Sequence, residues 1–141
     1  MMVPEYLYYA LVIGLAGTAA PFNRVALVVL AVWVLGQFAW LLGLPLAPVY
    51  LVIHCMAFVM ACVVARNPMC AIVAALFIPI IATDAAELMR WISPHSAWWG
   101  RVYLGSAQLL LLWPAVKFDA LLRAYNRIND RSSAHVERVA A

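Results

Sequence analysis

The stretch Val25–Leu44, which reads VALVVLAVWVLGQFAWLLGL, contains no Asp, Glu, Lys or Arg. A transmembrane helix needs about 20 consecutive and mostly apolar residues to cross the hydrocarbon core of a bilayer. This stretch has that length, and Gln37 is its only strongly polar side chain. It therefore predicts a membrane-spanning helix, and with it an all-α integral membrane fold.

The composition of the whole chain supports the same fold class. Of the 141 residues, 68% are hydrophobic and only 11% are charged, and the mean hydropathy is +0.96. Soluble domains carry about a quarter charged residues, and a small domain buries only about two-thirds of the surface that its unfolded chain exposes. We therefore expect lipid to solvate most of the apolar surface. The length suits one helical bundle without a separate soluble domain.

Five apolar stretches follow one another, separated by Pro, Gly or charged residues. The predicted transmembrane spans are about 6–20, 25–44, 48–65, 68–83 and 98–116. The first is short, so a four-span arrangement in which it lies on the membrane surface stays open. The turn GLPLAP at 43–48 is short enough to impose an antiparallel hairpin on the spans that flank it. Pro79 should kink the fourth span.

The distribution of basic residues predicts the orientation of the chain. In a five-span arrangement Arg24, Arg66 and the basic residues of 117–138 share one side, whereas Arg90 and Arg101 fall on the other. Cytoplasmic loops are the ones enriched in Lys and Arg. We therefore expect a bacterial inner-membrane protein with its N-terminus outside and its C-terminus in the cytoplasm. The N-terminal stretch lacks the basic region of a cleavable signal peptide.

Residues 117–131 predict an amphipathic helix after the last span. The apolar residues that recur at helical spacing on one face are Phe118, Leu121, Leu122, Tyr125 and Ile128. The residues of a basic stripe elsewhere on the helix are Arg123, Arg127 and Arg131. Such a helix suits the membrane surface, where it would lie on the inner leaflet or extend the fifth span. We expect 132–141 to form a disordered tail.

Three polar residues fall within the predicted spans, where an unpaired polar group is costly. They are Gln37, His54 and Gln108. Gln37 and His54 lie at similar distances from the inner ends of their helices, so we expect both to face inward and to share a hydrogen bond. The small residues on the same face as His54 are Ala57, Ala61 and Ala65. A structural hydrogen bond is favoured for His54, while conduction of protons or a solute and cofactor binding stay open.

A second candidate site lies at the outer end of the fourth span. Asp84, Glu87 and Arg90 are spaced three apart and so share a helix face. Arg101, one turn inside the fifth span, can reach this layer and pair with either acid. Two carboxylates on one face could bind a divalent cation or share a proton. We favour the simpler interpretation, a self-paired helix end at the interface.

No recognised catalytic or ligand-binding motif is present in the sequence. It contains no G-x-S-x-G, P-loop, Rossmann glycine pattern or HExxH. The three cysteines form no C-x-x-C, and no His partners them at zinc-site intervals. We therefore predict no enzymatic activity, no metal and no cofactor. The basic residues gather in the tail, where they act as topology determinants, so we expect no nucleic-acid partner.

These features favour an accessory or assembly subunit of a bacterial or phage membrane complex. The lipid bilayer is one partner, and a homo-oligomer or other membrane subunits are the expected protein partners. Small size, several spans and a charged basic tail also resemble phage holins in outline, so a holin-like, self-assembling membrane-permeabilising protein is one alternative. Five spans exceed the usual holin count. A small transporter or channel subunit is the other alternative.

Overall fold

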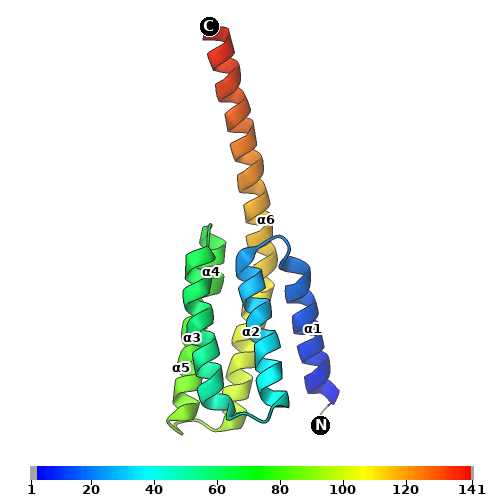
Figure 1. Ribbon diagram of the computed structural model, residues 1–141, viewed down its shortest axis with the longest axis vertical. Helices are drawn as coiled ribbons and strands as arrows, with labels where there is room; N and C mark the ends of the chain where they lie inside the picture. Colours follow the sequence, from blue (N-terminus) through cyan, green and yellow to red (C-terminus); the bar gives the residue numbers. More distant parts are fainter. Residues whose placement is uncertain (1–2, 141) are drawn as a thin grey trace.

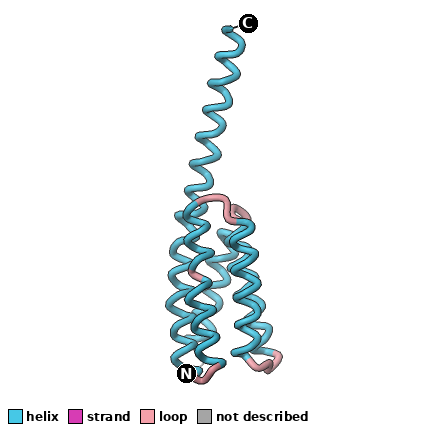
Figure 2. Tube along the Cα trace, turned by 90° about the vertical axis from the view of Figure 1, so that its left-hand side faces the viewer, coloured by secondary structure: helices cyan, strands magenta, loops and turns pink. Residues whose placement is uncertain are grey.

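The computed structural model describes residues 3–140, with side chains from residue 7 onward, and every regular element in that range is an α-helix (Figures 1 and 2). The helices are α1 (Val3–Ala19), α2 (Arg24–Leu41), α3 (Leu46–Val64), α4 (Pro68–Ala75), α5 (Phe77–Leu88) and α6 (Pro94–Ala140). Connected helices run side by side in alternating directions, apart from α4 and α5, which follow one another along the same line (Figure 1). The first part of α6 completes the bundle by packing on α1, α4 and α5.

Three helical segments are long and apolar enough to cross a membrane, namely α2, α3 and the continuous pair α4–α5 (Pro68–Leu88). Many of their large apolar side chains point away from the bundle, such as Val52, Met56 and Val63, which are 58%, 65% and 75% exposed. This chain is therefore an all-helical bundle whose composition indicates membrane association. The other two predicted spans, 6–20 and 98–116, are not both long enough and apolar enough to be included among these segments. The apolar part of α1 is short, and Arg101 and Gln108 lower the hydropathy of α6.

The predicted kink in the fourth span appears as a break between α4 and α5 at Leu76. Pro79 has no backbone N–H, and its ring clashes with the carbonyl of the residue four positions earlier. That residue is Ala75, where α4 ends. The break therefore falls one turn before the proline itself.

Close helix packing depends on small residues. A Cβ atom added at Gly105 of α6 would lie 2.4 Å from Cζ2 of Trp33 in α2, and one at Gly36 would lie 3.0 Å from the Tyr50 ring in α3. Ala57 and Ala61 are buried on the inner face of α3. Small side chains let helix backbones approach closely, which holds helices together where lipid replaces water as the solvent.

Helix α6 is longer than the sequence pattern predicts. It begins at Pro94 and continues through Pro114 to Ala140 without interruption, so 132–140 is helical where we expected a disordered tail. No Gly or Pro follows Pro114 to end the helix. Beyond Asp119, which still bonds Asn23 and Asn67 at the end of the bundle, α6 is exposed and projects along the long axis of the bundle (Figures 1 and 2). Residues 117–131 thus prolong the preceding helix instead of folding across the end of the bundle.

Candidate functional site

A cluster of four ionisable side chains lies inside the helical bundle, centred on the fully buried Asp84. His54 Nδ1 lies 2.5 Å from Asp84 Oδ2, and Arg101 Nε donates to Asp84 Oδ1 at 2.7 Å. Arg101 also donates from Nη2 to Glu87 Oε2. We refer to His54, Asp84, Glu87 and Arg101 as the polar tetrad.

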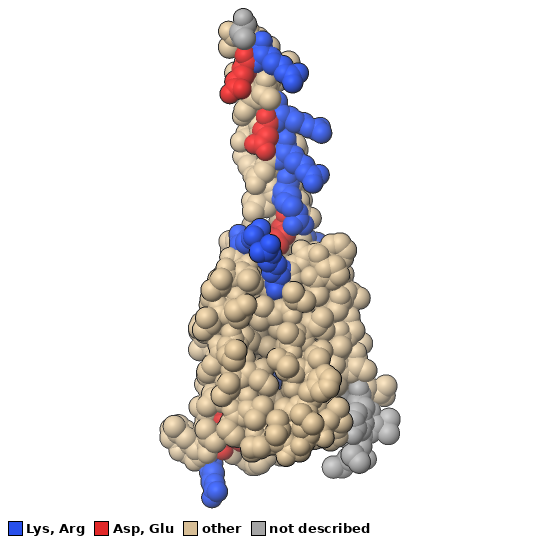
Figure 3. Space-filling model, viewed as in Figure 1, with Lys and Arg blue, Asp and Glu red and all other residues tan. Residues whose placement is uncertain are grey.

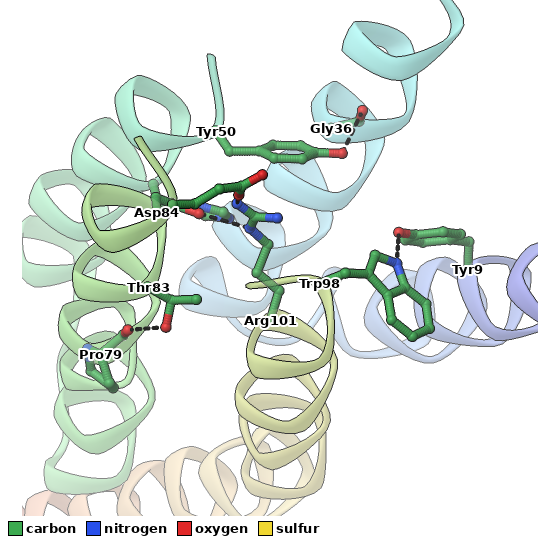
Figure 4. A network of polar contacts seen from close by, with 10 residues as sticks. Tyr9, Gly36, Tyr50, Pro79, Thr83, Asp84, Trp98 and Arg101 are labelled. Carbon is green, nitrogen blue, oxygen red and sulfur yellow. Dashed lines mark hydrogen bonds and ion pairs between the residues drawn. The ribbon is translucent and has the colours of Figure 1, made fainter. Parts of the chain in front are cut away.

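The polar tetrad joins three helices. His54 comes from α3, Asp84 and Glu87 are one helical turn apart on α5, and Arg101 comes from α6. Helices α3 and α5 pack along their length, and α6 packs on α5. Figure 4 shows Arg101 extending from its helix toward Asp84 on the facing helix. The tetrad therefore ties together the half of the bundle that α3, α5 and α6 form.

The aromatic ring of Tyr50 packs against two members of the tetrad, Arg101 and His54. The Arg101 guanidinium carbon lies 4.8 Å from the centroid of the Tyr50 ring, within cation–π range (Figure 4). The Tyr50 ring also stacks on His54 with 5.9 Å between ring centroids, and its hydroxyl donates to the Gly36 carbonyl at 3.4 Å. Tyr50 thus connects the tetrad to α2.

The hydrogen bonds of the tetrad offset the cost of burying charge. Both oxygens of Asp84 are engaged, and among the described residues every buried side-chain nitrogen or oxygen has a partner. Removing two charges from water costs several kcal/mol per ion, which close geometry and extra hydrogen bonds can recover. Loss of one member would leave the others buried without compensation. The arrangement is chemically suited to holding helices in register or to passing a proton between His54 and Asp84.

A small cavity of about 50 Å³ lies beside the tetrad. Its polar lining residues are Tyr9, Gln37, Tyr50, His54, Arg101 and Gln108. A buried water needs about 10–15 Å³ and at least two polar partners, so this space suits about three waters. Trp98, three residues before Arg101 on α6, also lines this cavity, and its Nε1 donates to the Tyr9 hydroxyl at 3.0 Å (Figure 4).

The intramembrane polar candidates occupy one region but do not form the pair we expected. His54 is buried and contacts Asp84, with no hydrogen bond to Gln37, which is half-buried and lines the cavity. Gln108 is buried and donates from Nε2 to the Val73 carbonyl at 3.2 Å. Gln108 therefore joins α6 to α4, and Asp84 takes the place beside His54 that we had predicted for Gln37.

The charged candidates at the end of α5 divide into two groups. Asp84, Glu87 and Arg101 meet in the tetrad, whereas Arg90 lies exposed beyond the helix end with a positive φ of 60°. Arg90 N–H donates to the Glu87 carbonyl and Trp91 N–H to the Ala86 carbonyl, which is the Schellman pattern of helix termination. Arg90 thus ends α5 and takes no part in the site.

The sequence analysis assigned His54 and Asp84 to two separate candidate sites, which the structure brings together. At about 1.5 Å per residue, His54 lies about 12 Å from the start of α3 and Asp84 about 6 Å from the end of α5. These two helix ends lie at the same end of the bundle, so the shift between the helices brings both side chains together. Sequence reasoning also missed Tyr50, although it precedes His54 by four residues and therefore shares its helix face.

Within residues 3–140, His, Cys, Asp and Glu side chains nowhere gather in groups of three or more that could hold a metal ion. Arg101 lies between the carboxylates of Asp84 and Glu87, at the position that a bridging cation would need. No protein-family model, curated protein or solved structure matches this chain.

Proposed function

We propose that this protein is a small multi-pass protein of the bacterial cytoplasmic membrane that serves as an accessory or assembly subunit of a membrane complex. In this proposal five helices cross the membrane, the N-terminus is outside and the C-terminus is cytoplasmic. Arg24, Arg66 and the basic residues of α6 beyond the bundle lie at one end of the molecule, which supports this orientation under the positive-inside rule.

The observation that carries the proposal is the exposed apolar face of the projecting part of α6, residues 118–140. This apolar stripe consists of Phe118, Leu121, Leu122, Tyr125, Ile128, Val136 and Val139. At 3.6 residues per turn, its members fall within about a third of the helix circumference. Leu121, Tyr125 and Ile128 are 67–70% exposed, so no other part of the described chain covers them.

An apolar stripe with this spacing is the surface that a helix presents to a second helix. Apolar residues separated alternately by three and four positions allow two helices to pack side by side, and most helical stability comes from such packing. The tetrad and the glycine contacts hold the base of α6 in the bundle. The stripe is therefore presented in a fixed direction to a helix of another subunit.

The complex can be tested with two variants of the full-length protein that carry the same added charge. Leu121→Asp with Ile128→Asp places two carboxylates in the stripe, and the control, Ala120→Asp with Ala134→Asp, places them on the opposite face. When membranes are extracted with a mild detergent, we expect the wild type and the control to be recovered as particles whose protein mass exceeds that of one chain. The stripe variant should fall to the mass of a single chain in size-exclusion chromatography with light scattering. A monomeric wild type, or equal dissociation of both variants, would contradict the proposal.

The cavity beside the tetrad favours a second candidate function, conduction of protons or a small polar solute. His54, Arg101 and Gln108 line it together, and under the proposed topology the helices that carry them cross the membrane. In proteoliposomes, His54→Ala should then abolish a pH-gradient-driven flux while the amount of inserted protein stays constant. Unchanged flux with a lowered unfolding temperature would instead assign His54 a structural role.

A further inference from the structure

A second polar cluster lies at the opposite end of the bundle, where α6 leaves it. The Asp119 carboxylate accepts hydrogen bonds from Asn23 Nδ2 at 3.0 Å and from Asn67 Nδ2. Asn23 caps the N-terminus of α2 through the Val25 N–H at 2.8 Å, and Asn67 caps α4 through the Cys70 N–H at 2.8 Å. One carboxylate on α6 therefore fixes the start of two other helices.

Beside this carboxylate the surface is hollowed to a volume of about 310 Å³. The α1–α2 loop, the α3–α4 loop and α6 form its walls, and its cationic residues are Arg24, Arg66 and Arg123. We refer to this depression as the basic hollow. Figure 3 shows Lys and Arg side chains gathered where α6 joins the bundle, with an acidic side chain between them. A volume near 300 Å³ lies within the range of small-molecule sites.

The charges of the basic hollow are not balanced by the chain itself. Within the described part of the protein, none of the three guanidinium groups has a hydrogen-bond or ion-pair partner. Asp119 is the only carboxylate among the lining residues, and both of its oxygens already accept from asparagines. The helices α2 and α4 also begin here, which adds the positive ends of two helix dipoles. The hollow therefore has an excess of positive charge and many unused N–H donors.

We propose that the basic hollow binds a phosphate group. The planar fork of an arginine guanidinium matches the oxygens of a phosphate, and three such forks around one depression can surround a single tetrahedral anion. Two rim residues are apolar and exposed, Phe22 at 58% and Leu122 at 42%. Apolar side chains beside three exposed arginines suit the headgroup of an anionic phospholipid, whose phosphate would enter the hollow while its chains follow the bundle.

The test measures lipid and phosphate binding to the full-length protein in a zwitterionic detergent by native mass spectrometry. Phosphatidylglycerol, phosphatidylcholine and inorganic phosphate are titrated at constant ionic strength. We expect one bound phosphatidylglycerol per chain, with an affinity about tenfold above that for phosphatidylcholine. If inorganic phosphate binds as tightly as phosphatidylglycerol, the free anion is the ligand. If only phosphatidylglycerol binds, it is the lipid. Absence of any preference for either over phosphatidylcholine and chloride would overturn the proposal.

Matched variants distinguish binding at the basic hollow from nonspecific attraction of the anion to the other basic residues of α6. Arg24→Gln, Arg66→Gln and Arg123→Gln together should lower the affinity about tenfold or more. The control, Arg127→Gln, Arg131→Gln and Arg138→Gln, removes the same charge from the projecting part of α6 and should retain wild-type affinity. Equal losses in both variants would contradict a specific site. If the triple variant does not fold, Arg123→Gln alone, at an exposed helix position, should still weaken binding more than Arg127→Gln alone.

Discussion

The two ends of the helical bundle use arginine in opposite ways. At the end where α5 gives way to α6, Arg101 is 13% exposed in its side chain and bonded to two carboxylates. At the end where α6 leaves the bundle, Arg24, Arg66 and Arg123 are exposed and unpaired around a hollow. The carboxylate of that end, Asp119, is bonded to two neutral amides instead.

This difference separates charge used for folding from charge available to a ligand. In the tetrad each partner satisfies another, so the cluster is complete without any added group. In the basic hollow three arginines outnumber one carboxylate, Asp119, whose oxygens bond two asparagines, so an external anion lowers the electrostatic energy of the arginines. The polar tetrad therefore contributes to folding, whereas the basic hollow is the surface that we propose binds an anion. Four predictions test this contrast, beginning with the largest expected effect.

Asp84→Ala should destabilise the protein most. It leaves the Arg101 and His54 side chains buried without their shared acceptor, and breaking a buried ion pair in this way costs about 3–5 kcal/mol. Chemical unfolding in detergent, followed by circular dichroism, measures the loss. Leu88→Ala, an exposed change one turn away on the same helix, is the control. An unfolding free energy close to that of the wild type would show that the tetrad contributes little to the stability of the fold.

Gly105→Ala should destabilise the protein by about 2 kcal/mol. The new Cβ would meet Trp33 at 2.4 Å, so α2 and α6 must separate or the indole must move. Gly14→Ala provides the control, because no atom lies within 4 Å of its added Cβ and alanine favours the helix. The two unfolding temperatures should shift in opposite directions. A shared upward shift would mean that α2 and α6 do not pack tightly at this point.

Asp119→Ala should destabilise the protein by about 1.5 kcal/mol, less than Asp84→Ala. Its partners are the buried but neutral amides of Asn23 and Asn67, so the change leaves amide groups, and no charge, without an acceptor. The same change removes the only carboxylate of the basic hollow, so binding of inorganic phosphate should strengthen. Chemical unfolding and a phosphate titration measure the two effects. If Asp119→Ala destabilised the protein as much as Asp84→Ala, the polar clusters at the two ends of the bundle would contribute equally to stability, contrary to this prediction.

Arg90→Gly should stabilise the protein by about 1 kcal/mol, the smallest effect of the four. Arg90 has a φ of 60°, which glycine adopts without a steric cost, and its side chain stays outside the tetrad. Gly43 has a φ of 64° in the equivalent position after α2. Gly43→Ala should therefore lower the free energy of unfolding by about the amount that Arg90→Gly raises it, and chemical unfolding measures both changes. A drop in stability on Arg90→Gly would mean that the arginine side chain contributes at this end.

Much of the helical pattern was predictable, because it depends on local composition. The turn at Gly43, the break near Pro79 and the small-residue face of His54 all follow from residues close together in the sequence. The reach of Arg101 to Asp84 and Glu87 was also anticipated from side-chain length. The partner of His54 was not, since depth counted along one helix omits the shift and rotation of its neighbour.

The basic hollow was hidden from sequence reasoning for a related reason. Asn23 and Asn67 are ordinary helix-capping residues in the sequence, and Asp119 resembles one member of an ion pair with Arg123 four residues later. In the structure Asp119 bonds both asparagines, which are 96 and 52 residues away. Arg123 is thereby left without a carboxylate partner and faces the hollow.

The sequence by itself determined that this chain is helical and apolar enough to associate with a membrane, whereas the helices of the structure set the number of segments long and apolar enough to cross it at three, not the predicted five. Hydropathy and helix length are properties of contiguous residues, so no tertiary contact is needed to read them. Only the tertiary structure decided which charges are paired and which remain open. Pairing depends on the register and rotation of packed helices, and a displacement of one helical turn, about 5.4 Å, would separate Asp84 from His54 without changing the hydropathy of either helix.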